Sequence, residues 1–228
     1  MKTRIPVIVE RGSKKAFASA VEWPGWSRGG RDETQALEAL VAYGARYKSA
    51  MHAAARDLIP PPDTSAVRVV ERLKGDTTTD FGVPTRGGAA DERPVNAAEL
   101  NRLSALLRAA WAAFDRAARA AAGVELAKGP RGGGRDLDPI IDHVLGAEES
   151  YVTAIGGRRP PDATDADART KQIHNEVLAA LAARARGEPP APSRRTSPLW
   201  TPRYFVRRSA WHVLDHAWEI EDRAKRPG

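Results

Sequence analysis

Two absences limit what this chain of 228 residues can be: it contains no cysteine, and it has no run of about 18 consecutive apolar residues. Without cysteine there are no disulfide bonds, no thiolate metal ligands and no cysteine nucleophile, so any metal ion would be bound by His, Asp or Glu. Without a long apolar run, the sequence predicts no membrane-spanning helix. The opening segment, MKTRIPVIVERGSKK, lacks both the apolar core and the cleavage site of a signal peptide, so we expect a cytoplasmic protein.

An acidic excess is also missing, because the net charge is +7 and arginine outnumbers lysine by 28 to 8. A basic chain often binds nucleic acid or an acidic ligand. Here, however, the arginines are scattered among acidic residues, and no dense basic block with interleaved aromatic residues occurs. We therefore do not expect nucleic-acid binding, and we expect a small-molecule substrate that is anionic.

The first 75 residues have the pattern of a small mixed module. Segments that are β-branched or partly alternating predict strands. Asp32, with Gln35 three residues later, begins a helical pattern that the proline-rich segment 59–65 ends. The predicted order is β-β-α-β, with strands at residues 5–10, 16–23 and 66–73 and the helix between residues 32 and 58.

Residues 76–95 are rich in Gly, Thr, Asp and Pro and are predicted to form a linker. From residue 96 onwards the pattern is helical. The fold class that we expect is therefore α+β: a small module over residues 1–75, followed by an all-α four-helix bundle over residues 96–228. Cap residues and apolar stripes place its helices at residues 97–123, 139–156, 166–187 and 203–225.

The segment WHVLDHAWEIEDR contains His212 and His216, four residues apart and without a helix breaker between them. On a helix these side chains lie about 40° apart and meet over one turn, so both imidazoles can bind one metal ion. Val213 stands where the H-E-x-x-H motif of zinc proteases has its glutamate, so we do not expect a protease. The pattern of a solvated face is the alternative. The residues beside the histidines are Arg208, Asp215, Glu219 and Arg223, and those opposite are Trp211, Leu214 and Trp218.

A second helical segment, DLDPIIDHVLGAEESYV, places His143 among small and apolar residues. An imidazole in such surroundings needs a polar partner. It is either a core histidine with an ordinary hydrogen bond or a third ligand that meets His212 and His216 across the bundle. His174, with Asn and Glu beside it in the sequence, is expected at the surface.

These features resemble the DinB/YfiT-like superfamily, which includes bacillithiol S-transferases and mycothiol-dependent maleylpyruvate isomerases. The resemblance covers residues 96–224 and depends on four helices, with DHVLGAEESYV on the second and HVLDHAWE on the fourth. It implies a divalent metal ion, Zn, Ni or Fe, bound by His143, His212 and His216, with positions open for water and substrate. It also implies a metal-dependent transferase or isomerase that uses a low-molecular-weight thiol.

Two further groups are candidates for the same site. The loop KGPRGGGRD supplies Lys128, Arg131 and Arg135, where an anionic substrate or the carboxylates of a thiol cofactor can dock. A flexible surface loop is the alternative. Glu219, three residues after His216, is a candidate catalytic base or a carboxylate that orients the histidine, and the alternative is an exposed ion pair with the arginine four residues later.

The N-terminal module resembles the small HicB-type antitoxin fold over residues 4–73. The matching segment, FASAVEWPGWSRGGRDETQALEAL, has the strand, the PG turn and the acidic-Thr-x-x-A-L helix start of that family. Because the chain has no helix-turn-helix pattern, the antitoxin function does not transfer. A substrate-covering or dimerising role, with the chain as a homodimer, stays open.

Two functions therefore remain as alternatives. In the first, the chain is a metal-dependent enzyme that acts on a small anionic substrate. In the second, the N-terminal module binds a partner protein and the helices form a metal-free scaffold. Three imidazole nitrogens that lie about 3–3.5 Å from one another would favour the first.

Overall fold

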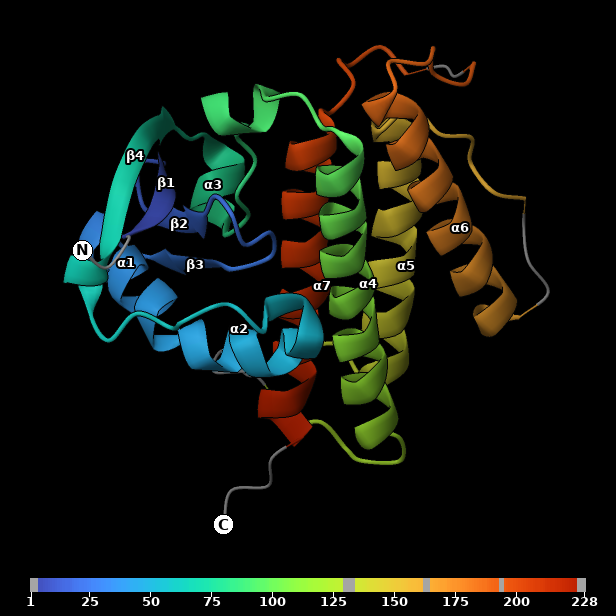
Figure 1. Cartoon of the computed structure of the whole chain (residues 1–228). Coiled ribbons are helices and arrows are strands. Elements are labelled where there is room, and N and C mark those ends of the chain that lie inside the picture. Colours follow the sequence, from blue (N-terminus) through green and yellow to red (C-terminus); the bar gives the residue numbers. More distant parts are fainter. Residues whose placement is uncertain (1–3, 129–133, 162–164, 193–194, 225–228) are drawn as a thin grey trace.

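The computed structural model describes residues 4–128, 134–161, 165–192 and 195–224. The fold is mixed α/β: a four-stranded sheet forms near the N-terminus, and the helices that follow it lie to one side of the sheet (Figure 1). The expected order of a sheet-containing part followed by a helical part is confirmed.

The sheet has the order β3-β2-β1-β4. β1 and β2 form an antiparallel hairpin, β2 and β3 form a second one, and β4 pairs with β1 in parallel. The middle of β1, VIVE, is buried on both faces, which explains why this strand reads as a continuous apolar run and not as an alternation. The strands are Ile5–Arg11 (β1), Ala16–Ala20 (β2), Ser27–Gly30 (β3) and Val67–Lys74 (β4).

The predicted order β-β-α-β was wrong in two places. β3 was missed because its sequence, SRGG, has weak strand propensity. The strand forms because its backbone pairs with β2, and Gly29 lets the ring of Phe17 approach: a Cβ atom on Gly29 would lie 3.0 Å from that ring. The single predicted helix is interrupted at Tyr43, which gives α1 (Glu33–Ala42), α2 (Gly44–Met51) and the short 3-10 helix η1 (His52–Ala55).

The predicted linker, residues 76–95, contains the short helix α3 (Thr77–Phe81) and the 3-10 helix η3 (Ala89–Glu92), while another 3-10 helix, η2 (Thr64–Ala66), precedes β4. Thr79 and Asp91 are buried. Local caps explain this structure, because the Asp76 carboxylate accepts hydrogen bonds from the first turn of α3. The segment therefore packs against the rest of the fold, although the proposed domain division itself stays a prediction.

Four long helices follow residue 96, as predicted, and a side-chain cap begins the first and the third of them. Asn96 accepts a hydrogen bond from the backbone N–H of Glu99 at the start of the first. The second begins two residues earlier than predicted, and Pro139 fits within its first turn because the N–H groups there have no partner inside the helix. The helices are α4 (Ala97–Ala120), α5 (Leu137–Ala154), α6 (Ala166–Ala185) and α7 (Pro202–Ala224).

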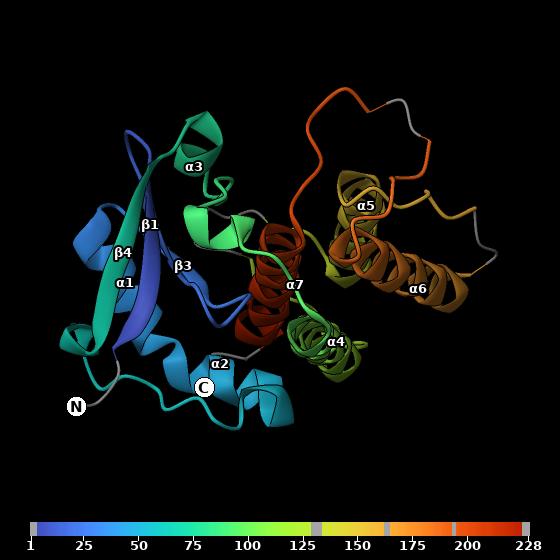
Figure 2. The same cartoon turned by 45° about the horizontal axis from the view of Figure 1, so that its top comes forward.

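α7 lies at the centre of the molecule, with the sheet on one side and α4 and α5 on the other (Figure 2). The β2–β3 hairpin reaches α7: the Phe17 ring packs edge-on against Trp211, and Arg28 pairs with Asp215 at 2.9 Å. Gly25, with φ of 91°, lies so close to α7 that an added Cβ atom would be 2.8 Å from Leu214. One apolar core therefore runs from the sheet through α7 into α4 and α5.

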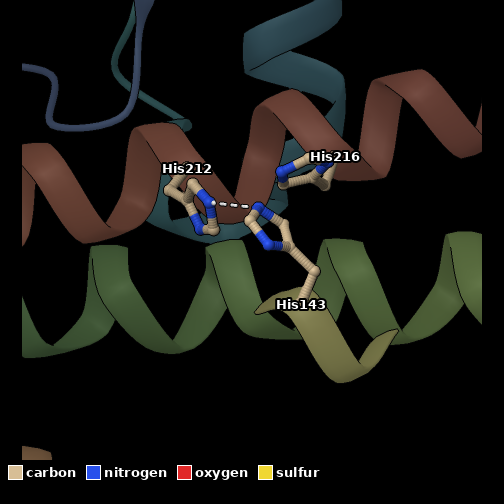
Figure 3. A group of neighbouring side chains, drawn as sticks. All are labelled: His143, His212 and His216. Carbon is tan, nitrogen blue, oxygen red and sulfur yellow. Dashed lines mark hydrogen bonds between the residues drawn. The ribbon is translucent and has the colours of Figure 1, made fainter. Parts of the chain in front are cut away.

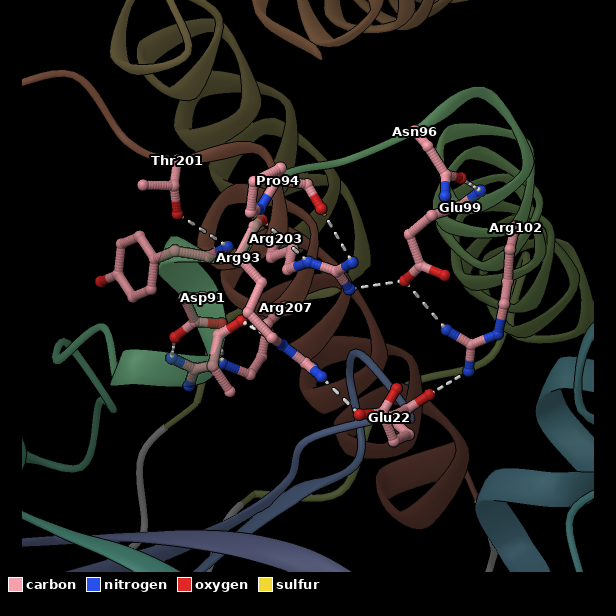
Figure 4. Close-up of polar contacts among 12 residues, drawn as sticks. Glu22, Asp91, Arg93, Pro94, Asn96, Glu99, Arg102, Thr201, Arg203 and Arg207 are labelled. Atoms are coloured by element: carbon pink, nitrogen blue, oxygen red, sulfur yellow. Dashed lines mark hydrogen bonds and ion pairs between the residues drawn. The ribbon is translucent and has the colours of Figure 1, made fainter.

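Charged residues tie the segment around η3 to α7 and α4 (Figure 4). Arg207 pairs with Asp91 at 2.5 Å, and both side chains are only 7% exposed. Around this buried pair, Arg203 pairs with Glu99 and Arg93 pairs with Glu22 nearer the surface. A buried charge that loses its partner is strongly destabilising. The Arg207–Asp91 pair therefore favours the arrangement of α7 and η3 in which both charges meet.

Candidate metal centre

Three histidines from two helices meet between α5 and α7 (Figure 3). His143 projects from α5, and His212 and His216 project from successive turns of α7. The Nε2 atoms of His143 and His212 are 3.3 Å apart. The ring of His216 lies 4.9 Å from that of His143 and 4.7 Å from that of His212, measured between centroids. The three residues come together as predicted: the His143–His212 separation lies in the expected range of about 3–3.5 Å, and the three ligand atoms lie within 4.8 Å of one another.

The solvated-face interpretation of the pair on α7 is wrong. His212 is 7% exposed, and the side chain of His216 is 14% exposed. The helical pattern alone predicts a wet face, because charged residues share that side of α7. α5 covers it, however, and the opposite side is covered by the β2–β3 hairpin, so that α7 is buried on both sides.

The donor set fits a divalent metal ion. Two nitrogens that each bind one tetrahedral ion at 2.0–2.1 Å lie about 3.3–3.4 Å apart, which is the separation of the His143 and His212 Nε2 atoms. The three ligand atoms all lie within 4.8 Å of one another. The imidazoles are therefore close enough for one ion to contact all three after small side-chain adjustments.

The local electrostatics keep the imidazoles in the form that binds metals. Burial, with smaller contributions from the neighbouring histidines and Arg208, lowers the pKa of His212 to about 2. Burial is also the main cause that lowers the pKa of His143 below its ordinary value. Only a neutral imidazole has a free lone pair, so His143 and His212 are ready to act as ligands at neutral pH.

Glu219 contacts the third histidine directly. Its Oε2 atom lies 2.8 Å from Nδ1 of His216, and its Oε1 atom accepts a hydrogen bond from Arg223 at 2.8 Å. The hydrogen bond with His216 is the main cause that lowers the pKa of Glu219. A carboxylate that is hydrogen-bonded to one imidazole nitrogen leaves the other nitrogen free to bind a metal ion. Metal-bound histidines usually have such a hydrogen-bond partner. Both oxygens are engaged, which favours a positioning residue over a catalytic base.

The predicted anion-binding loop is placed only in part. Arg131 lies outside the described residues, and Lys128 and Arg135 are exposed. The start of the loop is held to α7 by two hydrogen bonds between Ala127 and Arg223. The charge of Arg135 contributes to the low pKa of His143 and His212, so this arginine is near enough to act on the site.

Sequence reasoning missed Arg208, which extends the site along α7. Arg208 stands four residues before His212 and was assigned to a wet face. Its guanidinium lies 5.3 Å from the centre of the Tyr151 ring, and that ring lies 5.9 Å from the ring of His212. Trp200 packs 5.0 Å from Tyr151. The four-residue spacing that identified His212 and His216 also points to Arg208, one turn earlier.

His174, which was expected at the surface, lies instead on the wall of a groove of about 740 Å³ between α4, α5 and α6. Its ring stacks on Trp111 with centroids 3.6 Å apart, and its Nε2 atom is 3.4 Å from the buried Glu148 carboxylate. Trp111 also donates a hydrogen bond to Glu148. The carboxylate has two polar partners here, which is how a buried acid is stabilised in a core.

The low pKa of His212 predicts an acid-sensitive fold in the metal-free protein. Below about pH 6.5 the unfolded chain binds a proton at this residue, whereas the folded chain does not until about pH 2. Acid therefore favours unfolding. From about pH 6.5 to pH 5 the free energy of unfolding should fall by about 1.6 kcal/mol more in the wild type than in His212→Gln. Urea unfolding with a chelator present measures this difference, and equal slopes in both proteins would contradict it.

Within the part of the chain that the structure describes, no helix is both long and apolar enough to cross a membrane. Comparisons with protein-family models, with curated proteins and with solved structures found no match for the chain.

Proposed function

We propose that this chain is a divalent-metal-dependent enzyme of the DinB/YfiT-like type, with His143, His212 and His216 as the metal ligands. The observation that carries the proposal is the meeting of three partly or fully buried imidazoles, two of them with lowered pKa values, around one point. Among the described residues the group that could bind one ion consists of three histidines, and a three-histidine set is typical of a catalytic and not a structural metal site.

The arrangement of the long helices supports the same class. α4 packs along α7, and α5 packs on both α6 and α7. We propose that these helices form the four-helix bundle of that superfamily, in which metal ligands project inward from facing helices. The ligands come from α5 and α7, the second and fourth helices of the proposed bundle.

A divalent ion at this site, Zn, Ni or Fe, would supply a Lewis acid that lowers the pKa of a bound water or thiol. The residues of the chain do the rest. His143 and His212 stay neutral because they are buried, and Glu219 holds the ring of His216 in one orientation. Transfer or isomerisation with a low-molecular-weight thiol is the reaction class that we propose, with a small anionic substrate.

The N-terminal module has a role in this proposal that does not need a partner protein. Its β2–β3 hairpin covers the face of α7 opposite the histidines, where Trp211 and Leu214 are buried. A module whose apolar contacts are made within the chain is better suited to supporting the site than to binding a partner as an antitoxin would. We propose that the HicB-like module fixes α7, and that a homodimer, if formed, uses other surfaces.

The test is the metal content of the purified full-length protein. The wild type should bind one divalent ion, and a variant with alanine at His143, His212 and His216 should bind none, as measured by elemental analysis and by titration with Zn²⁺, Ni²⁺ and Fe²⁺. His52→Asn is the matched control, because His52 is exposed and lies outside the cluster. Circular dichroism establishes that each variant is folded. Equal metal content in the wild type and the triple variant would refute the proposal.

A further inference from the structure

Two buried side-chain nitrogen atoms at the edge of the histidine cluster have no hydrogen-bond partner among the described residues. They are Nδ1 of His212 and Nη1 of Arg208. Buried polar groups are nearly always paired, so each such group in a folded protein requires an explanation. A guanidinium nitrogen only donates hydrogen bonds, which means that Arg208 lacks an acceptor.

The two groups are neighbours. Arg208 and His212 stand four residues apart on α7, a spacing at which side chains meet over one turn. Both lie beside one ring: Tyr151 is 5.3 Å from the guanidinium of Arg208 and 5.9 Å from the ring of His212.

Comparison within α7 shows that this arginine differs from the others. Arg203, Arg207 and Arg223 pair with Glu99, Asp91 and Glu219 at 2.6, 2.5 and 2.8 Å. Among the residues that the structure describes, Arg208 is the one arginine of α7 without a carboxylate partner. Its guanidinium instead lies near the faces of Tyr151 and Trp211.

The histidines of α7 differ in the same way. His216 has Glu219 on its Nδ1 atom, whereas no described residue contacts Nδ1 of His212 by a hydrogen bond. Nε2 of His212 points toward His143, so in a neutral ring that ligates through Nε2 the proton is on Nδ1. A metal-bound histidine almost always donates this second N–H, most often to a carboxylate or a carbonyl oxygen.

We infer that Arg208 and the Nδ1–H of His212 together bind the carboxylate of a small acid whose flat apolar part lies against Tyr151 and Trp200. One carboxylate offers acceptors to both donors, and arginine binds this group in a planar, two-pronged geometry. The inference rests on the proposed function, because the metal-binding role of Nε2 places the proton on Nδ1. It also names the substrate class of that site.

The aromatic residues favour a flat ligand. Tyr151 and Trp200 lie with their ring centres 5.0 Å apart, and both are half-buried, as is Arg208. A planar acid can stack on such rings while its carboxylate contacts the arginine. The exposed cations Lys128 and Arg135 are less suited to this task, since a charge in water contributes little to a specific ion pair.

The experiment measures benzoate binding to the full-length protein loaded with Zn²⁺, by isothermal titration calorimetry. Arg208→Gln should weaken binding about 10- to 100-fold, which is the effect of losing hydrogen bonds to a charged group. Arg56→Gln, the matched control at an exposed arginine of the N-terminal module outside the histidine cluster, should leave the affinity unchanged. Benzamide, a neutral ligand of the same shape, should bind the wild type far more weakly than benzoate does.

A second readout reports on His212 itself. In protein labelled with ¹⁵N-histidine, benzoate should shift the Nδ1–H resonance of His212 in the wild type and leave it in place in Arg208→Gln. Circular dichroism and zinc content of each variant establish that it is folded and loaded.

The outcomes separate the two proposals. Stoichiometric zinc with no benzoate binding, or with equal benzoate affinity in the wild type and Arg208→Gln, overturns the inference and leaves the proposed function intact. Equal binding of benzamide also overturns it. Absence of zinc from the wild type refutes the proposed function, and benzoate binding that still depends on Arg208 would then support the carboxylate site alone.

Discussion

Replacing Asp91 by alanine is expected to lower the free energy of unfolding by about 3–5 kcal/mol. Asp91 and Arg207 form a salt bridge in which both side chains are 7% exposed. Asp91 also accepts a hydrogen bond from the backbone N–H of Gly88 at 2.8 Å. Without the carboxylate, the guanidinium of Arg207 stays in the core of the α7–η3 contact with no compensating charge, and that desolvation is the main cost.

Urea unfolding at neutral pH measures this effect, with Glu22→Ala as the control. Glu22 pairs with Arg93 in the same network (Figure 4), but the two side chains are 41% and 49% exposed, so its loss should cost about 1 kcal/mol or less. The double variant Asp91→Ala with Arg207→Met should recover much of the stability, because no buried charge remains. If Asp91→Ala costs no more than Glu22→Ala, the buried pair does not stabilise the fold as argued.

The second large effect is expected at Glu219. Glu219→Gln keeps the size of the side chain but removes the charge that holds Nδ1 of His216 at 2.8 Å. Loss of such an orienting carboxylate typically weakens metal binding about 10- to 100-fold. We therefore expect the metal affinity of the variant to fall by about this factor, with the stoichiometry unchanged.

Competition with a chromophoric chelator measures the affinity. Glu221→Gln is the matched control: it lies on the same helix two residues later and pairs with Arg46 at the surface, away from the histidines. Its metal affinity should equal that of the wild type. The positioning role of Glu219 is refuted if Glu219→Gln binds metal as tightly as Glu221→Gln does.

Local sequence signals predicted most of the elements. Asp32 and Asn96 cap the helices that their side chains indicated, because a cap depends on residues within one turn. β3 has no such signal, since Ser27–Gly30 has little strand propensity and is held by pairing with β2. Contacts from outside the segment decided that strand.

The candidate site, too, was predictable where it depends on local sequence and not where it depends on contacts between distant segments. The sequence by itself determined that His212 and His216 share one side of a helix, because four residues make little more than one turn. His143 was added as the third ligand from its apolar surroundings and from the resemblance to a family. The partner of His216 was left open between two interpretations, and the structure places Glu219 in contact with both His216 and Arg223.

Only the tertiary structure decided that both sides of α7 are buried. The periodicity of α7 predicts one apolar and one wet side, but burial is a property of neighbours and not of a helix alone. α5 covers the side with the histidines, and the β2–β3 hairpin covers the other. For that reason His212 is buried and neutral, and the buried guanidinium nitrogen of Arg208 lacks a partner among the described residues.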